Sequence, residues 1–240
     1  MKARLSLPLA AALLAFGAGC IDNWQSFYVR DNKRLGEPPG CEIPTDPNAT
    51  GLLGGVLDVS IAHSYAAYLF TENRLIIRED EGLPRAESNG IFVQGAYLDY
   101  EPDPTCGAPL GATEVRFSNF IDPQASATIG IWLIPEAMGL NLTAAALAGC
   151  PLQEMNIVVT VQLFGVTQAG IELETQPFDY PITICNGCLA YCPIGMTCPP
   201  ATPHPGTNCD CDNTDVDTGE MPCHPGQDDL VDCRLVPPCI

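Results

Sequence analysis

Hydrophobic residues recur at every second position through the middle of the chain. This alternation is typical of strands that bury one face and expose the other. Two further runs, residues 65–77 and 91–100, are more continuously apolar; residues 71–73 interrupt the first run, and the second has no readable face. The alternating rows lie at residues 57–61, 115–117, 129–133, 157–163, 171–173 and 178–184. The pattern predicts seven or eight strands between residues 51 and 184.

The spacing of these strands indicates the fold class. Turn signals recur about every ten residues and helical patterns are scarce, which favours an antiparallel arrangement. We therefore expect a mainly β chain with an antiparallel immunoglobulin-like β-sandwich over residues 51–184, while a jelly roll or a small barrel stays open. One alanine-rich segment, residues 143–148, predicts a short helix that ends at Gly149. Pro181 indicates an edge strand or a bulge, since proline donates no ladder hydrogen bond.

The composition changes at Cys185. Residues 185–240 contain nine cysteines and nine prolines, and the strand-like alternation stops there. A segment so poor in large aliphatic residues is not held by a hydrophobic core alone, and its cysteine content is typical of a disulfide scaffold. We expect an irregular tail that disulfide bonds hold together.

The first twenty residues have the features of an export signal. A short basic region precedes an apolar run that is too short for a permanent transmembrane helix, and small residues then lead to Cys20. The segment resembles a bacterial lipoprotein signal, although Gly17 stands where such signals usually carry leucine. This resemblance implies that residues 1–19 are removed and that Cys20 carries acyl chains such as palmitate.

The residue after Cys20 indicates in which membrane the lipid anchor is expected. Ile21 follows where an aspartate would be the usual signal for retention in the inner membrane. We therefore expect a lipid anchor in the outer membrane, facing the periplasm or the cell surface, with residues 20–50 as a tether. A soluble periplasmic protein is the alternative.

The charge of the mature chain limits its partners. Removal of the signal leaves eight basic and 29 acidic residues, a formal net charge of −21. Such a surface repels nucleic-acid phosphates and anionic lipid headgroups. We therefore expect no nucleic-acid partner, and a membrane contact only through the lipid on Cys20. A protein or glycan ligand is expected, of a kind that the sequence does not identify.

The chain has thirteen cysteines. In an oxidising envelope they are expected to form disulfide bonds, and twelve remain if Cys20 carries lipid, which is an even number. The twelve candidates are Cys41, Cys106, Cys150, Cys185, Cys188, Cys192, Cys198, Cys209, Cys211, Cys223, Cys233 and Cys239. Nine of them lie in the tail and three outside it, so an odd number of bonds must join the two parts. We expect one such bond, from Cys41, and a second bond between Cys106 and Cys150, whose loops can meet at one end of a sandwich.

Cys185 and Cys188 have the C-x-x-C spacing that thiol redox proteins use. The βαβ pattern of a thioredoxin does not surround them, so we expect structural bonds, each to a cysteine outside the pair. The spacing of residues 185, 188, 192 and 198 could also suit zinc, but histidine is scarce in the tail and the envelope favours oxidation. We expect no metal ion and no cofactor.

Five acidic residues crowd the segment 210–220. Closely spaced carboxylates are ligands that calcium prefers. The EF-hand pattern is not matched, because Asp215 stands where the invariant glycine belongs. A solvated acidic loop is the main expectation, and calcium binding stays open.

Motifs for nucleophilic or metal-dependent hydrolysis are absent: the sequence has neither G-x-S-x-G nor H-E-x-x-H. His63 and Ser64 fall in a predicted strand, where neighbouring side chains point to opposite faces. A glycosidase-like carboxylate pair stays possible, because sequence does not place the acidic residues relative to one another. We expect a protein that is not an enzyme and has no catalytic residues.

Two motifs of the tail carry a family resemblance. Residues 181–189 read PITICNGCL, with a C-x-G-C-L junction, and residues 223–228 read CHPGQD. With the lipoprotein signal and the β-rich body, these motifs resemble uncharacterised cysteine-tailed lipoproteins of myxobacterial type. The resemblance implies an envelope location and this architecture, and it brings no activity with it.

These observations together predict a lipid-anchored cell-envelope protein with a binding or structural role. One alternative is a secreted hydrolase that uses acidic residues on the sandwich loops. Another is a calcium-dependent adhesion module.

Overall fold

The structure is a computed structural model of the chain, and it describes residues 26–77, 88–102, 106, 110–142, 150, 154–191 and 220–232. Strands hold 53% of these residues, and the one helix among them, α1 (Glu136–Gly139), has four residues. The prediction of a mainly β chain is therefore confirmed. Within this described part, no helix combines the length and the apolar character needed to cross a bilayer.

The smaller sheet has four antiparallel strands in the order β2-β1-β4-β7. Its strands are β1 (Phe27–Lys33), β2 (Gly51–Leu52), β4 (Tyr65–Asn73) and β7 (Ala125–Ile134). Strand β1 lies where we expected a tether, and that prediction is wrong for residues 27–33. Phe27 is 1% exposed and Val29 is 9% exposed, so their alternation buries apolar surface that a tether would leave in water.

The larger sheet has the order β3-β10-β8-β5-β6, with β9 beside β8. Its strands are β3 (Gly55–Asp58), β5 (Ile91–Pro102), β6 (Thr113–Ile121), β8 (Met155–Thr167), β9 (Glu172–Glu174) and β10 (Phe178–Cys185). Strands β3 and β10 run parallel, so the expectation of a wholly antiparallel body is wrong at this pair. The chain leaves β2 through Leu53 and Gly54 and crosses to the other sheet, where β3 meets the last long strand instead of its sequence neighbours.

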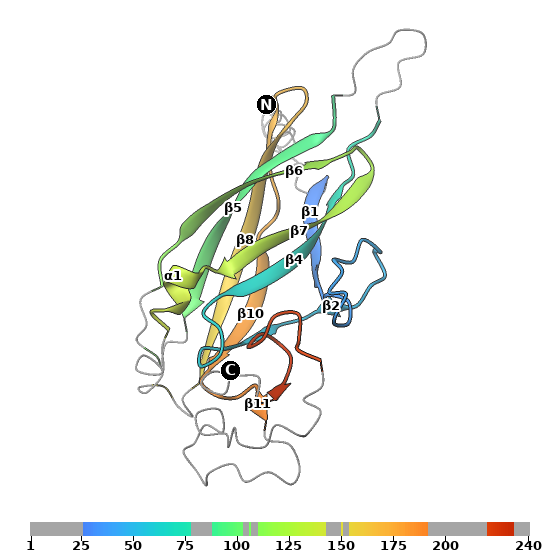
Figure 1. Ribbon diagram of the computed structural model, residues 1–240. Helices are drawn as coiled ribbons and strands as arrows, with labels where there is room; N and C mark the ends of the chain where they lie inside the picture. The colour runs from blue at the N-terminus through green and yellow to red at the C-terminus, as the bar shows by residue number, and fades with distance from the viewer. Residues whose placement is uncertain are drawn as a thin grey trace, which may run out of the picture.

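Side chains from both sheets form one hydrophobic core between them, and Figure 1 shows β4 and β7 crossing β8 and β10. Two predicted rows are confirmed as buried: residues 157, 159, 161 and 163 of β8, and residues 129, 131 and 133 of β7. Trp132 lies on the outer face of β7, as its alternation predicted, and is 51% exposed. Full burial of one such aliphatic side chain contributes about 1.5–3 kcal/mol, so these rows are a main source of stability.

Strand β4 continues through residues 71–73, where we expected an interruption. The polar side chains there have partners inside the fold: Asn73 donates to the backbone carbonyl of Asn89 at 2.9 Å and to that of Ile121 at 3.2 Å. A buried polar group that is hydrogen-bonded does not interrupt a strand.

Pro181 lies in β10 opposite Val158 of β8. It precedes the four residues of β10 that pair with β3, which begin at Ile182. The missing proline N–H is therefore tolerated next to the open part of the β10 edge. The predicted helix at residues 143–148 falls outside the described residues.

Lys33 is a buried cation, 1% exposed, at the end of β1. Its ammonium group donates to Asp31 Oδ2 at 3.1 Å and to the carbonyl oxygens of Pro47 at 2.9 Å and Ala49 at 2.8 Å. It also lies 5.0 Å from the centre of the Phe70 ring. These contacts satisfy all three donors of the ammonium group and attach the loop before β2 to the smaller sheet.

Candidate functional site

The structure contains two disulfide bonds that we expected. Cys41 is bonded to Cys223 with a Cα–Cα distance of 5.6 Å, and Cys106 to Cys150 with a Cα–Cα distance of 5.0 Å. The first joins the N-terminal region to the tail across 182 positions of sequence. Both pairings are confirmed.

A third disulfide bond joins Cys185 to Cys188. The expectation that each would bond outside the pair is wrong, because the turn between them brings their Cα atoms to 5.9 Å. The remaining six candidate cysteines lie outside the described residues, as do Cys20 and residues 210–219 of the acidic loop. These six are Cys192, Cys198, Cys209, Cys211, Cys233 and Cys239.

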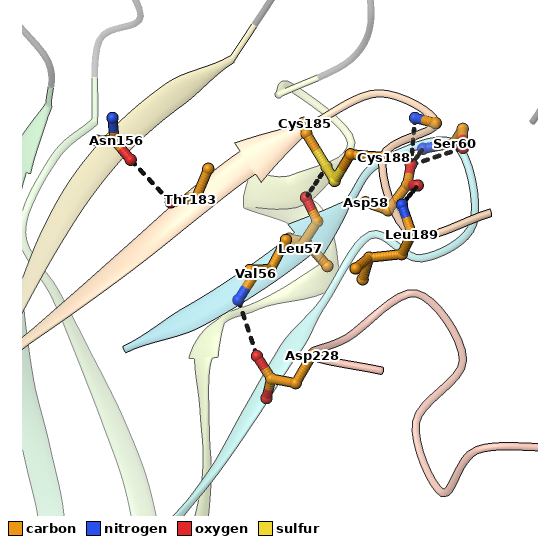
Figure 2. Close-up of a disulfide and its surroundings, with 11 residues drawn as sticks. Val56, Leu57, Asp58, Ser60, Asn156, Thr183, Cys185, Cys188, Leu189 and Asp228 are labelled. Carbon is orange, nitrogen blue, oxygen red and sulfur yellow. Dashed lines mark hydrogen bonds between the residues drawn. A yellow bond between two sulfur atoms is a disulfide. The ribbon is translucent and has the colours of Figure 1, made fainter. Parts of the chain in front are cut away.

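Asp58 organises the turn that contains this disulfide, as Figure 2 shows. Its carboxylate is fully buried and accepts hydrogen bonds from the backbone N–H of Gly187 at 2.7 Å and of Leu189 at 2.9 Å. The backbone N–H of Ser60, at 3.0 Å, and the Ser60 hydroxyl, at 2.6 Å, donate to the same group. Hydrogen bonds to an ionised acceptor are the stronger kind. The carboxylate therefore holds residues 185–189 against the end of β3.

The alternation at residues 57–61 predicted that Asp58 faces solvent on a half-buried strand. This prediction is wrong, since β3 ends at Asp58 and residues 58–61 turn, with the Ile61 N–H donating to the Asp58 carbonyl at 3.0 Å. The Asp58-to-Ser60 contacts are an Asx-type turn, a local alternative to strand pairing. A glycine at position 187 suits the turn because its φ is +84°.

Asp58, Cys185 and Cys188 bring their ligand-type atoms within 4.8 Å of one another. Cys185 is buried and Cys188 is exposed. The disulfide uses both sulfur atoms, and four hydrogen bonds use the carboxylate, so the geometry is that of a structural turn. This arrangement accounts for the C-x-G-C-L motif.

The second motif belongs to a stretch that we call the closing segment, residues 223–231. Its backbone continues the larger sheet beyond β3: Asp58 N–H donates to the Gly226 carbonyl at 2.9 Å, and Asp228 N–H donates to the Val56 carbonyl at 3.0 Å. Gly226 has a φ of +83°, a conformation that glycine adopts without a steric penalty. Strand β3 is therefore held between β10 and the closing segment.

The side chain of Gln227 replaces a missing strand partner. Its Oε1 accepts the Ala66 N–H at 2.9 Å, and its Nε2 donates to the Ala66 carbonyl at 2.7 Å. Ala66 lies at the irregularity where β4 pairs with β7, so these bonds satisfy backbone groups of β4. An unpaired buried backbone group would cost about 1–3 kcal/mol.

Asp228 connects the closing segment to both sheets. Its Oδ1 accepts the Val56 N–H at 2.8 Å, and its Oδ2 accepts the Tyr65 hydroxyl at 2.8 Å. The Tyr65 hydroxyl also lies 3.0 Å from that of Tyr180. Burial raises the pKa of Asp228, although these donors offset part of the effect, and burial likewise raises the pKa of Tyr65. Both tyrosines are at most 1% exposed and Asp228 is half-buried, so the two phenol groups are closed to a substrate.

His224 packs on the outer face of the smaller sheet. Its Nε2 lies 2.6 Å from the Tyr68 hydroxyl, and its ring stacks on Tyr68 with centres 5.9 Å apart. The edge of Trp132 faces the same ring. A hollow of about 50 Å³ lies beside it. This is far below the roughly 300–1,000 Å³ of small-molecule sites, so the histidine has a packing role.

His63 lies in the loop between β3 and β4, and our placement of it in a strand is wrong. Its carbonyl lies against Gly139 of α1, where any side chain would collide with it. Its Nδ1 is buried and has no hydrogen-bond partner among the described residues. His63 is part of the packing at this end of the body.

Four aromatic side chains lie together on the outer face of the larger sheet. We call it the aromatic strip: Phe92, Tyr97, Phe120 and Phe164. Phe92 contacts Phe120 with ring centres 4.8 Å apart, and Tyr97 stacks on Phe164 at 4.6 Å. Phe92 is 43%, Tyr97 42% and Phe120 38% exposed. Arg116 lies over the Phe164 ring, with Cζ 4.7 Å from its centre.

Gly95 makes the aromatic strip possible. It lies in β5 opposite Arg116 of β6 and Phe164 of β8. A Cβ at this position would come within 2.6 Å of the Phe164 ring, so the missing side chain leaves room for that ring to lie across β5. A pairing irregularity between Val93 and Gly95 turns both Phe92 and Tyr97 outward.

The aromatic strip could not be predicted from the alternation, because the run 91–100 has no readable face. The irregularity inserts an extra residue into the alternation, so the outward positions change parity along β5. The available signal was Gly95 inside an otherwise apolar strand, since an interior glycine often marks such a bulge or a close approach.

A scan of the chain against protein-family models finds no match, and a search of the curated proteins finds no significantly similar sequence.

The role of Asp58 predicts the effect of its loss. Asp58→Asn replaces one acceptor oxygen with a donor that faces an N–H group, so we expect the free energy of unfolding to fall by about 1–3 kcal/mol. The matched control is Asp179→Asn, whose carboxylate is exposed and accepts from Thr160 at 2.7 Å, with an expected change below about 1 kcal/mol. Urea denaturation measures both. Equal stability of the Asp58 and Asp179 variants would contradict the role of Asp58.

His224 predicts a pH dependence. Burial lowers its pKa, so the unfolded chain takes up the proton at a higher pH than the folded protein does. The free energy of unfolding therefore keeps its full value above the pKa of the unfolded histidine, about 6.5, and falls as the pH decreases below that value. We expect thermal unfolding to shift to lower temperature between about pH 8 and about pH 5.5, and to shift less in His224→Asn. Parallel pH profiles for both proteins would show that another group is responsible.

Proposed function

We propose that the protein is a lipid-anchored protein of the cell envelope, held in the outer membrane through Cys20, and that it binds a ligand without catalysis. The aromatic strip is the ligand-binding surface. The observation that carries the binding role is the set of half-exposed rings of Phe92, Tyr97 and Phe120. Phe92 contacts Phe120, and Tyr97 stacks on Phe164, over which Arg116 lies. Large exposed aromatic side chains that gather on one face of a sheet indicate an interaction site.

The shape and chemistry of the aromatic strip favour a glycan as ligand. Phe92 and Tyr97 lie five positions apart on β5, which corresponds to about 15 Å along the strand, and polar side chains border the rings. Gln162 donates to Glu174 at 3.0 Å on one side, and Glu114 pairs with Arg116 on the other. A narrow row of ring faces with hydrogen-bonding groups at its margins suits the C–H faces and hydroxyl edges of a sugar chain.

The net charge of the protein limits the kind of glycan that it can bind. The mature chain has the formal net charge of −21 derived above from eight basic and 29 acidic residues. Coulombic repulsion then disfavours polyanionic chains, so we propose a neutral or weakly charged polysaccharide.

The strand order supports an immunoglobulin-like classification of the body as part of this proposal. In such sandwiches, the first, second and fifth strands lie in one sheet, and the third, sixth and seventh lie in the other. Here β1, β4 and β7 form one sheet, while β10, β8, β5 and β6 form the other, with β3 beside the last long strand. Such domains commonly present ligand-binding surfaces on a rigid scaffold.

The hydrolase alternative required carboxylates that converge on a substrate. Asp58, which is buried, and Asp228, which is half-buried, instead bind backbone N–H groups and hydroxyl groups of the fold. The binding role therefore has the better support. The calcium-dependent adhesion alternative concerns residues 210–220, most of which lie outside the described part of the chain.

The aromatic strip predicts a binding defect on truncation. Phe92→Ala and Tyr97→Ala should each weaken binding to a neutral polysaccharide about five- to tenfold, because each removes one stacking surface of about 1 kcal/mol. Affinity electrophoresis in gels that contain the polysaccharide measures the loss. Trp132→Ala, on the other sheet, removes an exposed ring of similar kind and should bind as the unchanged protein does. If both Phe92→Ala and Tyr97→Ala bind the polysaccharide as tightly as the unchanged protein does, the aromatic strip is not the binding site. If the protein binds a protein partner and no polysaccharide, the proposed glycan class of ligand is refuted.

The anchor makes a separate prediction. Cys20→Ala should release the protein from the membrane fraction, since stable attachment needs more than a single acyl chain and the substitution removes them all. Mass spectrometry of the membrane-bound protein should show an acylated Cys20 at the mature N-terminus. An unmodified Cys20 in that protein would end the anchoring proposal.

A further inference from the structure

Exposed isoleucines gather at the end of the body opposite to the tail. We call this surface the apolar tip: Leu75, Ile76, Ile77, Ile171 and Leu173. Ile76 is 71%, Ile171 60% and Ile77 45% exposed. Together these residues line an open hollow of about 350 Å³. Large exposed aliphatic side chains that cluster in one place indicate a contact surface.

Hydrogen bonds give the apolar tip a defined shape. The Asn89 side chain donates to the Ile76 carbonyl at 2.5 Å, and the Leu75 N–H donates to the Asn73 side chain at 3.0 Å. The turn between β8 and β9 is tied to the same place, since the Gln168 N–H donates to the Gly90 carbonyl at 2.9 Å. The isoleucines are therefore presented by a fixed scaffold.

The N-terminal end of the body enters at the apolar tip. Strand β1 pairs with β4 so that Phe27 lies opposite Asn73, and the Arg74 N–H donates to the Ser26 carbonyl at 2.7 Å. Ser26 therefore lies beside Arg74, which directly precedes Leu75 of the apolar tip. The chain toward Cys20 leaves from the same end at which the isoleucines are exposed.

Chain length then limits how far the apolar tip can lie from the anchor. Ser26 is six positions after Cys20, and six residues span at most about 20 Å when fully extended. Strand β8 alone, Met155–Thr167, extends about 40 Å. A tether this short keeps the Ser26 end of the body as the end nearest to the bilayer.

We propose that the apolar tip rests on the surface of the lipid bilayer, with Ile76, Ile77 and Ile171 inserted among the headgroups and upper acyl chains. This inference rests on the lipid anchor of the proposed function. The contact is apolar and needs no basic residues, so it is compatible with the acidity of the chain. In Figure 1 the β8–β9 turn lies at the top and β11 (Ala190–Tyr191) at the bottom, so the part of the tail at β11 points away from the membrane.

A second copy of the chain suits this surface less well. A stable protein interface buries about 800 Å² on each partner, and three exposed isoleucines with two half-buried leucines form a smaller patch. A bilayer imposes no such requirement, because the acyl chains on Cys20 supply the attachment and the apolar tip adds orientation.

The test uses the full mature protein with its lipid, reconstituted in phosphatidylcholine vesicles. Both native tryptophans, Trp24 and Trp132, are changed to Phe, and one tryptophan is introduced by Ile77→Trp or by Ile171→Trp. Quenching by lipids brominated in their acyl chains reports proximity to the bilayer. The matched control is Leu230→Trp, because Leu230 is 61% exposed and precedes β12 (Val231–Asp232), the partner of β11 at the tail end.

We expect at least twofold stronger quenching at positions 77 and 171 than at position 230, together with emission at shorter wavelength. Two probes on different segments keep the test decisive if one variant does not fold, which circular dichroism shows. Mass spectrometry on the same samples establishes whether Cys20 is acylated. An acylated, vesicle-bound protein with equal quenching at all three positions overturns the docking of the apolar tip and leaves the anchor standing. An unacylated protein that stays in solution overturns the anchor itself.

Discussion

The structure depends on how strand β3 is held in place. Two carboxylates fix it. Asp58, the last residue of β3, accepts N–H groups from the C-x-G-C-L turn, and Asp228 of the closing segment accepts the N–H of Val56 within β3. The buried charge of Asp58 would be costly without these hydrogen bonds, and the half-buried Asp228 ties a distant part of the chain to the same short strand. The disulfide between Cys41 and Cys223 closes the same region covalently.

This arrangement changes the meaning of the two tail motifs. Both contain groups that chemistry could use, namely a C-x-x-C pair, a histidine and several carboxylates. The structure engages them in the packing of tail against body: Gln227 pairs with the backbone of Ala66, and His224 lies on Tyr68. The described residues of the tail are thus joined to the body by these polar contacts, by the disulfide bond between Cys41 and Cys223 and by buried side chains such as Leu189 and Val231.

The surfaces proposed for function lie on other parts of the body. The aromatic strip occupies the outer face of the larger sheet, and the apolar tip lies at the end where β1 begins. If the apolar tip rests on the membrane, β5 and its rings extend outward from the bilayer along the side of the domain. Under the proposed function, such an orientation would keep the aromatic strip accessible to a ligand.

The sequence by itself determined the mainly β composition, the buried rows of β7 and β8, and, through the parity of the cysteines, that a disulfide bond joins the tail to the rest of the chain. These features are local, or follow from counting, so alternation and composition are enough to predict them. Only the tertiary structure decided that Asp58 is buried, that Cys185 bonds to Cys188, that β1 joins the smaller sheet and that β5 turns its rings outward at Gly95. The Cys185–Cys188 bond is local, but Asp58 holds its turn from far away in the chain. The other outcomes also depend on contacts between residues far apart in the chain, and the period of a single segment carries no information about its distant partners.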